Sequence, residues 1–157
     1  MRIETTVLDT ALLRLLLAIA PWTQQERAEQ QRLYAAICEQ AAEAWQAAGA
    51  TFDDNDGFAV KEEAREAIVT LNLELRDLRA MAGWFAGVRV EPQVIGRPLA
   101  QAIEALLLKT LPAWIKRAAI EEQLKKMPPD LRAALAREAK AAEKADATGG
   151  LPDEEAK

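Results

Sequence analysis

The sequence predicts an all-α fold, a single-domain bundle of about five to six helices, and three observations support it. The 157 residues are the size of one domain, with 50% apolar and 29% charged residues, as in a globular protein. The chain holds 33 Ala and 20 Leu but only 6 Val and 8 Ile, so strong helix formers outweigh strand formers. Apolar residues also recur at helical spacing along most of the chain.

Two helices near the N-terminus have clear start and stop signals. Thr6 and Thr23 each precede an acidic residue by three positions, which is the spacing of a capping box. Pro21 ends the first helix, and Gly49 is a typical C-cap for the second, which we expect over about 24–48. The first helix is apolar over more than half of its circumference, so it should be mostly buried.

The pattern over 60–85 predicts a third helix with two apolar faces. One face holds Ile68, Leu71, Leu75, Leu78, Ala82 and Phe85, and the other holds Val69, Leu73, Ala80 and Trp84. The basic side chains between the faces are Lys61, Arg65, Arg76 and Arg79. A helix with two apolar faces needs two partners. It lies either at the centre of a single-chain bundle or with one face against another subunit.

Prolines divide the second half of the chain. We expect an extended connector near 88–97, which is either packed across the bundle or offered to a neighbour as an arm. Helices at about 98–111 and 113–127 follow, with a break or kink at Pro112.

The expected domain organisation has three parts. Residues 1–127 form the helical core, and 128–147 form an Ala-rich helix that buries few large side chains and is therefore weakly anchored. Residues 148–157, rich in Gly and charged residues, form a disordered tail.

The composition excludes several classes of enzyme. The chain has no His and no Ser, so Ser-His and Cys-His nucleophile systems and His-based metal sites are ruled out. It also has no Gly-rich phosphate loop. Cys38 is the one cysteine and lies on a helical apolar stripe, which indicates a small buried side chain and not a reactive thiol. We therefore expect no catalysis by this chain alone and no cofactor.

An acidic loop at 53–57 partly matches the ligand pattern of a calcium-binding loop. With Gly57 at the sixth position of an EF-hand loop, three acids fall on ligand positions, but the first position would be Phe52. The acids of this region are Asp53, Asp54, Asp56 and Glu63. Because the first ligand is missing, we interpret the loop as a solvated connection whose acids lie before a helix N-terminus.

The charge balance argues against general binding to nucleic acid or membranes. With 20 basic and 25 acidic residues, the net charge is −5. Residues 89–126 nevertheless hold seven basic and four acidic groups, so a helical subunit that contacts nucleic acid through this segment is the alternative function. The apolar run 12–20 is interrupted by Arg14 and is too short for a membrane span, so we expect a cytoplasmic location.

By elimination, the sequence predicts a non-catalytic protein–protein interaction subunit, an adaptor, assembly or regulatory component of a larger bacterial or phage complex. Its expected partner is a second copy of the chain, most simply in a two-fold dimer, or another protein subunit. The candidate interaction surface combines apolar and basic side chains. These are Val69, Leu73, Trp84 and Trp114, with Arg65, Arg76, Arg79, Lys116 and Arg117.

Overall fold

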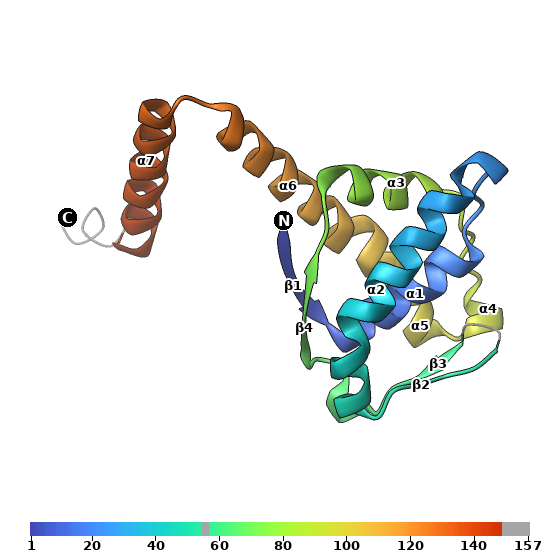
Figure 1. Cartoon of the computed structure of the whole chain (residues 1–157). Helices are drawn as coiled ribbons and strands as arrows, with labels where there is room; N and C mark the ends of the chain where they lie inside the picture. The colour runs from blue at the N-terminus through green and yellow to red at the C-terminus, as the bar shows by residue number, and fades with distance from the viewer. Residues whose placement is uncertain (55–56, 149–157) are drawn as a thin grey trace. The chain divides into compact units, whose positions relative to one another are not determined.

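The computed structural model describes residues 1–54 and 57–148, and helices make up 72% of it, which confirms the mostly helical prediction (Figure 1). The elements are β1 Arg2–Thr6, α1 Val7–Ile19, α2 Arg27–Ala48, β2 Thr51–Phe52, β3 Phe58–Ala59, β4 Ile68–Asn72, α3 Leu75–Phe85, α4 Pro92–Ile95, α5 Arg97–Ala105, the π-helix η3 Leu106–Thr110, α6 Leu111–Lys126 and α7 Pro129–Thr148. The chain divides into two compact units, Met1–Ala119 and Ile120–Lys157.

Helices α1 and α2 begin and end close to their predicted bounds. The Thr6 hydroxyl accepts the Asp9 N–H at 3.1 Å and so caps α1. A 3-10 turn precedes α2, and there the Glu26 carboxylate accepts the Thr23 N–H at 2.9 Å. Gly49 ends α2 with a φ of 69°, in the left-handed region. Residues with a Cβ rarely adopt this backbone conformation, whereas glycine adopts it readily.

The predicted helix over 60–85 is wrong in its first half. Ile68–Asn72 forms strand β4, and only the later part is helical, as α3. Val69, Leu71 and Leu73 are buried while the residues between them are half-buried or exposed, which is the alternation of a strand. Helical spacing also fits these apolar residues, so the pattern alone was ambiguous, and pairing with β1 decides the outcome.

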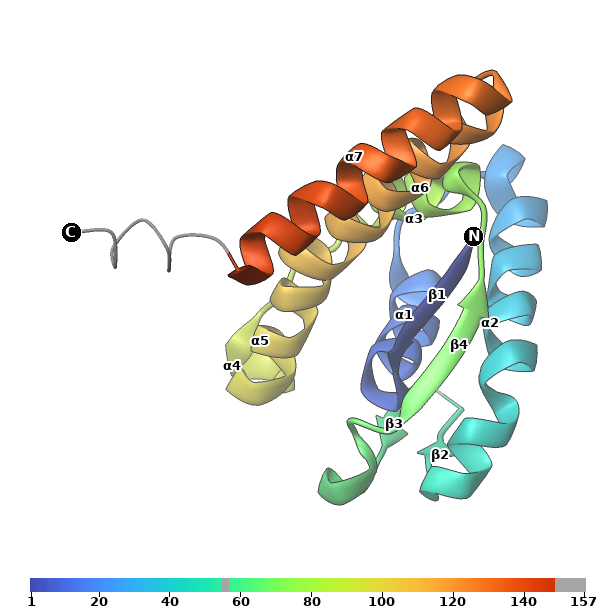
Figure 2. The same cartoon turned by 90° about the vertical axis from the view of Figure 1, so that its left-hand side faces the viewer.

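The first unit contains two small antiparallel sheets, which the sequence did not indicate. Strand β1 pairs with β4, from Arg2 opposite Asn72 to Thr6 opposite Ile68. Strands β2 and β3 pair in a hairpin. Figure 2 shows β1 and β4 facing the viewer, with α1 behind them and α2 beside β4. The sheet therefore covers one side of α1.

Helix α1 lies at the centre of the first unit, and most of its apolar side chains are buried, as predicted. Two buried hydrogen bonds join it to α2. The Trp45 indole N–H donates to the Thr10 hydroxyl at 2.8 Å, and the Gln30 amide donates to the Leu17 carbonyl at 2.8 Å. Because a buried polar group without a partner is costly, these bonds specify how the two helices pack.

The connector predicted near 88–97 is extended only in part. Val88 and Val90 pack against the core. The short helix α4 follows, and Gly96, at φ 91°, is its C-cap. Proline favours the first turn of a helix because its φ is already set, which explains the start of α4. Helices α5, η3 and α6 then form one continuous run, with a widened turn in place of a break before Pro112.

The second unit consists of the end of α6 and helix α7. Arg132 of α7 donates to carbonyl oxygens at the C-terminal end of α6, which have no partner within their own helix. The acceptors are Leu124 at 2.8 Å, Lys125 at 3.1 Å and Met127 at 3.3 Å. One guanidinium thus caps the preceding helix.

The two units divide at Ala119, inside α6, whereas the sequence indicated a core that ends at Met127. Thr148 is the last residue of α7, and the rest of the expected tail, 149–157, lies outside the described residues. Over 1–54 and 57–148, no helix combines the length and the apolar character needed to cross a bilayer.

Candidate protein-binding groove

An apolar groove of about 290 Å³ lies between the end of α3 and the start of α6. Its lining residues are Ala82, Phe85, Ala86, Val88, Leu107, Leu108, Leu111, Pro112 and Ile115. Phe85 and Leu111 are buried, whereas Leu108 is 75% exposed. An exposed leucine beside an aliphatic hollow is typical of a surface that receives apolar side chains of another molecule.

The π-helix η3 supplies the leucines of this groove. The Leu111 N–H donates to the Leu106 carbonyl, five residues earlier. In an α-helix the Pro112 ring would clash with the Leu108 carbonyl, and proline has no N–H to offer it, so the wider turn relieves a steric conflict. The turn runs from buried Leu106 through half-buried Leu107 to exposed Leu108, and thus connects the core to the groove edge.

Exposed cations flank the groove. Each is adjacent in the chain to a lining residue or lies one helical turn from it. They are Arg79, Arg89, Lys109 and Lys116. None of the ion pairs found in the described part of the chain involves these four side chains. Glu91 and Glu104 are the acids at comparable positions, so positive charge prevails around the groove.

The apolar residues of the predicted interaction surface are not at the surface. Val69, Leu73 and Trp84 are 3%, 3% and 5% exposed and belong to the core. The Trp84 indole N–H also donates to the Glu26 carboxylate at 2.6 Å. Trp114 of α6 is buried too. The alternative in which this second apolar face packs against another subunit does not hold, because the continuous helix that would present it does not form and its residues are buried within the chain.

The basic residues of the predicted surface are exposed but do not form one surface. Arg79 and Lys116 flank the groove. Arg65 lines a different hollow, near α5, and Arg76 pairs with a Glu74 oxygen at 2.8 Å. Arg117 borders a third hollow, beside β1. The structure thus brings only two of the nine predicted residues to the groove.

Sequence reasoning missed Leu108, the exposed leucine of the groove. A signal was present, because Leu108 falls outside the helical stripe formed by Ile103, Leu107 and Leu111. A leucine off the core stripe, four residues before a proline, indicates an apolar side chain left at the surface.

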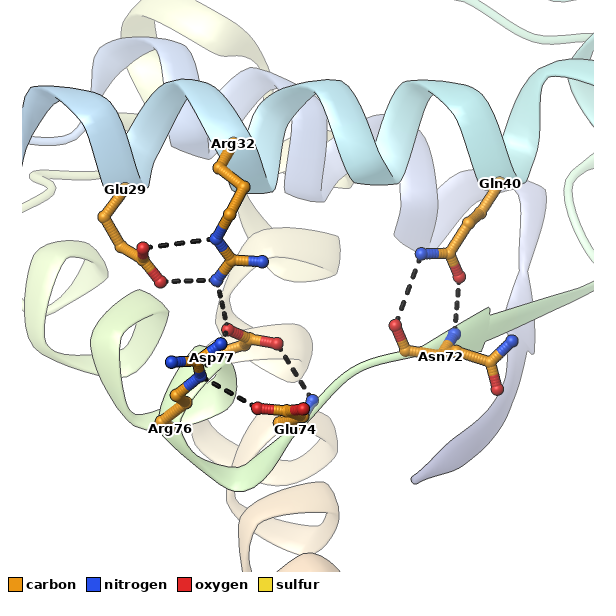
Figure 3. A network of polar contacts seen from close by, with 7 residues as sticks. All are labelled: Glu29, Arg32, Gln40, Asn72, Glu74, Arg76 and Asp77. Carbon is orange, nitrogen blue, oxygen red and sulfur yellow. Dashed lines mark hydrogen bonds and ion pairs between the residues drawn. The ribbon is translucent and has the colours of Figure 1, made fainter.

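A cluster of ion pairs joins α2 to α3 (Figure 3). The Arg32 guanidinium donates to the Glu29 carboxylate and, at 2.5 Å, to the Asp77 carboxylate. Asp77 also accepts the Glu74 N–H at 2.9 Å. Hydrogen bonding to the two acids raises the pKa of Arg32, and the bond from Arg32 lowers the pKa of Glu29. A carboxylate held ionised in this way, as Glu29 is, is a poor proton donor.

Asp9 is the carboxyl group whose surroundings favour protonation. Burial raises its pKa, the hydrogen bond from the Thr5 hydroxyl at 3.1 Å lowers it, and the charge of Glu66 raises it further. A side-chain hydrogen bond with Thr6 also lowers its pKa, and the Asp9 N–H donates to the Thr6 hydroxyl. These are the contacts of a carboxylate in the first turn of a helix.

The acidic loop closes the β2–β3 hairpin. The Asp53 N–H donates to the Gly57 carbonyl at 3.0 Å, and the Gly57 N–H donates to the Asp53 carboxylate at 2.8 Å. Asp56 lies outside the described residues, and among those described no three metal-ligating side chains gather. The interpretation of this loop as a solvated connection stays a prediction.

Comparisons with known proteins identify no relative: no protein-family model matches, and neither the curated proteins nor the solved structures give a significant match. The fold and the groove define this chain as a mostly helical protein with small antiparallel sheets and an apolar surface groove. Evidence for its function therefore comes from its own side chains.

Proposed function

We propose that this chain is a non-catalytic protein–protein interaction subunit, an adaptor, assembly or regulatory component of a larger bacterial or phage complex. We propose further that its groove binds an acidic amphipathic helix of another subunit. The observation that carries the proposal is an apolar groove with exposed Leu108 at its edge and, among the described residues, exposed cations around it that make no ion pair. Amphipathic helices bind to such grooves through apolar side chains at positions i, i+3 or i+4, and i+7.

Charge complementarity supports an acidic partner. The chain as a whole carries a net charge of −5, so an acidic protein is repelled by most of its surface. Around the groove, by contrast, four cations stand against two acids. A helix with glutamates beside its apolar stripe would therefore be attracted to this one region and oriented by it.

The chemistry of the acidic groups supports a non-catalytic role. Glu29 is held ionised by Arg32, and Glu26 accepts two N–H bonds that lower its pKa. The chain has no Ser and no His, and these two acids are held in the ionised form, in which they are poor proton donors. The single cysteine, which cannot form an internal disulfide, is in keeping with a reducing, cytoplasmic compartment.

The nucleic-acid alternative depends on the basic segment 89–126. Arg89, Lys109 and Lys116 of that segment flank the groove. Aliphatic side chains offer no hydrogen bond to a phosphate, however, so the lining favours an apolar helix face over a nucleic-acid backbone. Binding of DNA is accordingly one outcome of the test that follows.

Fluorescence anisotropy tests the groove. The probe is a short labelled peptide with Leu at positions i, i+4 and i+7 of a helix and Glu elsewhere, beside a scrambled peptide of the same composition and a labelled DNA duplex. Leu108→Glu should weaken binding of the patterned peptide about tenfold or more, because burying one leucine is worth roughly 1.5–3 kcal/mol. Val94→Glu is the matched control, because Val94 is also 75% exposed but lies outside the groove.

Equal binding of the patterned and the scrambled peptide would contradict the proposal, and so would a patterned-peptide affinity that Leu108→Glu leaves unchanged. DNA binding that exceeds peptide binding and falls steeply with salt would favour the nucleic-acid alternative instead.

A further inference from the structure

The outer edge of strand β1 has unpaired main-chain groups. Met1 and Leu73 exchange both main-chain hydrogen bonds, at 2.8 and 3.0 Å, so the odd-numbered residues of β1 face β4. The N–H and C=O groups of Arg2 and Glu4 therefore point away from β4. The described residues provide no hydrogen bond to these groups.

The opposite edge of the sheet is closed. The main-chain groups of Asn72 point away from β1, and the Gln40 side chain of α2 pairs with both of them (Figure 3). The Asn72 N–H donates to the Gln40 carbonyl at 2.5 Å, and the Gln40 amide donates to the Asn72 carbonyl at 3.3 Å. Proteins commonly cover or charge a sheet edge to prevent pairing, and here one edge is covered while the other is open.

We propose that β1 pairs with β1 of a second copy of this chain, antiparallel about a two-fold axis at Ile3. Arg2 then lies opposite the partner copy's Glu4, and Glu4 lies opposite its Arg2. Both pairs use the outward-pointing main-chain groups, so each pair forms two hydrogen bonds. The result is a four-stranded sheet in the order β4-β1-β1-β4.

Charge complementarity selects this register. Arg2 and Glu4 are both exposed, and their side chains point to the same, outer face of the sheet. The neighbouring registers that also match the outward main-chain groups place Arg2 opposite Arg2 or Glu4 opposite Glu4. Opposite charges across a strand pair are favourable and like charges are unfavourable, so only the register centred on Ile3 is self-complementary.

The structure leaves space at this edge. A hollow of about 370 Å³ lies against Arg2 and Glu4, and Arg117 of α6 is its third lining residue. Figure 2 shows β1 as the edge strand of its sheet, with β4 on one side only. Because the contact adds few hydrogen bonds, we expect a weak dimer with a dissociation constant in the micromolar range.

This interface is separate from the groove and does not depend on the proposed function. Neither Arg2 nor Glu4 lines the groove. A chain that fails to dimerise could therefore still bind an acidic helix, and a chain that binds no peptide could still dimerise.

Sedimentation velocity over a micromolar to submillimolar concentration series tests the dimer, with any purification tag at the C-terminus. The mass of the original chain, 17.3 kDa as a monomer, should approach twice that value as the concentration rises. Arg2→Glu and Glu4→Arg should each weaken self-association about tenfold, because each replaces attraction by repulsion twice in the dimer. An equimolar mixture of the two variants should form a heterodimer, because every opposed pair is again of opposite charge.

Arg27→Glu and Glu43→Arg are the matched controls, because both residues are exposed on α2 and the variants change the net charge equally. They should leave the dimer unchanged, and all four variants should keep the circular dichroism spectrum of the original chain. A monomer across the whole series would overturn the proposal. So would a dimer that Arg2→Glu and Glu4→Arg do not weaken, or a mixture of these variants that associates no better than each alone.

Discussion

Single side chains connect α2 to the segment around α3. The Glu26 carboxylate, at the start of α2, accepts the Thr23 N–H and the indole N–H of Trp84. A few residues later, Arg32 reaches Asp77, which is only 4% exposed. These contacts join residues more than forty positions apart in the chain. Because the pKa of Glu26 is lowered in the folded state, the charge state of Glu26 bears on the stability of the fold.

We predict that the stability advantage of the original chain over Glu26→Gln shrinks as the pH falls from neutral to about 3. Hydrogen bonds from Thr23 and Trp84 lower the pKa of Glu26 below 4.5 in the folded state. Such a group stabilises the fold above pH 4.5, and the contribution is lost as the pH falls through the folded-state pKa. Urea denaturation at a series of pH values measures the difference.

Asp9→Asn should show the opposite trend in the same experiment. Burial raises the pKa of Asp9 above 3.8, so the folded state binds the proton more tightly than the unfolded state. The original chain should therefore gain stability relative to Asp9→Asn as the pH falls through that pKa. Parallel pH dependence of the two variants would contradict both assignments.

At the scale of elements, helix ends are set by local conformation and strands by their partners. Gly49 occupies the left-handed region at φ 69° where α2 ends. Gly83 lies inside α3, and beyond its own helix turn no atom lies within 4 Å of the position that a Cβ would take. Glycine is favourable at position 49, because it adopts positive φ without strain. It is unfavourable at position 83, because a glycine loses more backbone entropy in a helix than any other residue.

We predict that Gly49→Ala destabilises the fold by about 1 kcal/mol, whereas Gly83→Ala stabilises it by about 0.5–1 kcal/mol. Alanine is strained at positive φ but is the best helix former in a helix interior. Urea denaturation compares the free energies of unfolding of the two variants. Two shifts of the same sign would show that one of the two backbone environments is misassigned.

At the scale of the whole molecule, the two units differ in how many of their described side chains are buried. The buried core extends from Ile3 to Ala118 in the described part of the chain. In α7, Leu135 is half-buried and Leu131 is 50% exposed. Helix α7 therefore buries few large apolar side chains among its described residues, and Arg132 bonds it to the end of the preceding helix.

We predict that truncation after Met127 leaves a cooperatively folded protein with a melting temperature within several degrees of the full chain. The truncated chain loses the bonds from Arg132 to the α6 carbonyls, but these groups then face water. Calorimetry measures the transition, and the Arg132→Ala variant of the full chain separates the cap from the rest of α7. A truncated chain with no cooperative transition would show that α7 belongs to the core.

The sequence predicted the helices wherever capping chemistry and apolar spacing agreed. Thr6 and Gly49 mark helix ends through bonds and dihedral angles that each residue makes locally. The groove was harder to predict, because Phe85 and Leu111 come together only through packing. The same holds for β1, whose pattern from Arg2 to Thr6 is five residues long and too short to indicate a strand without its partner.

By itself, the sequence determined the mostly helical composition, the bounds of α1 and α2, the excluded chemistries and the charge balance, because these depend on residue types and on contacts within a few positions. The tertiary structure decided the rest. Val69 and Leu73 fit a helix and a strand almost equally well, and only pairing with β1, more than sixty residues away, makes them strand and core. The same pairing leaves one edge of β1 open. A local pattern carries no information on which distant segment will satisfy its main-chain hydrogen bonds.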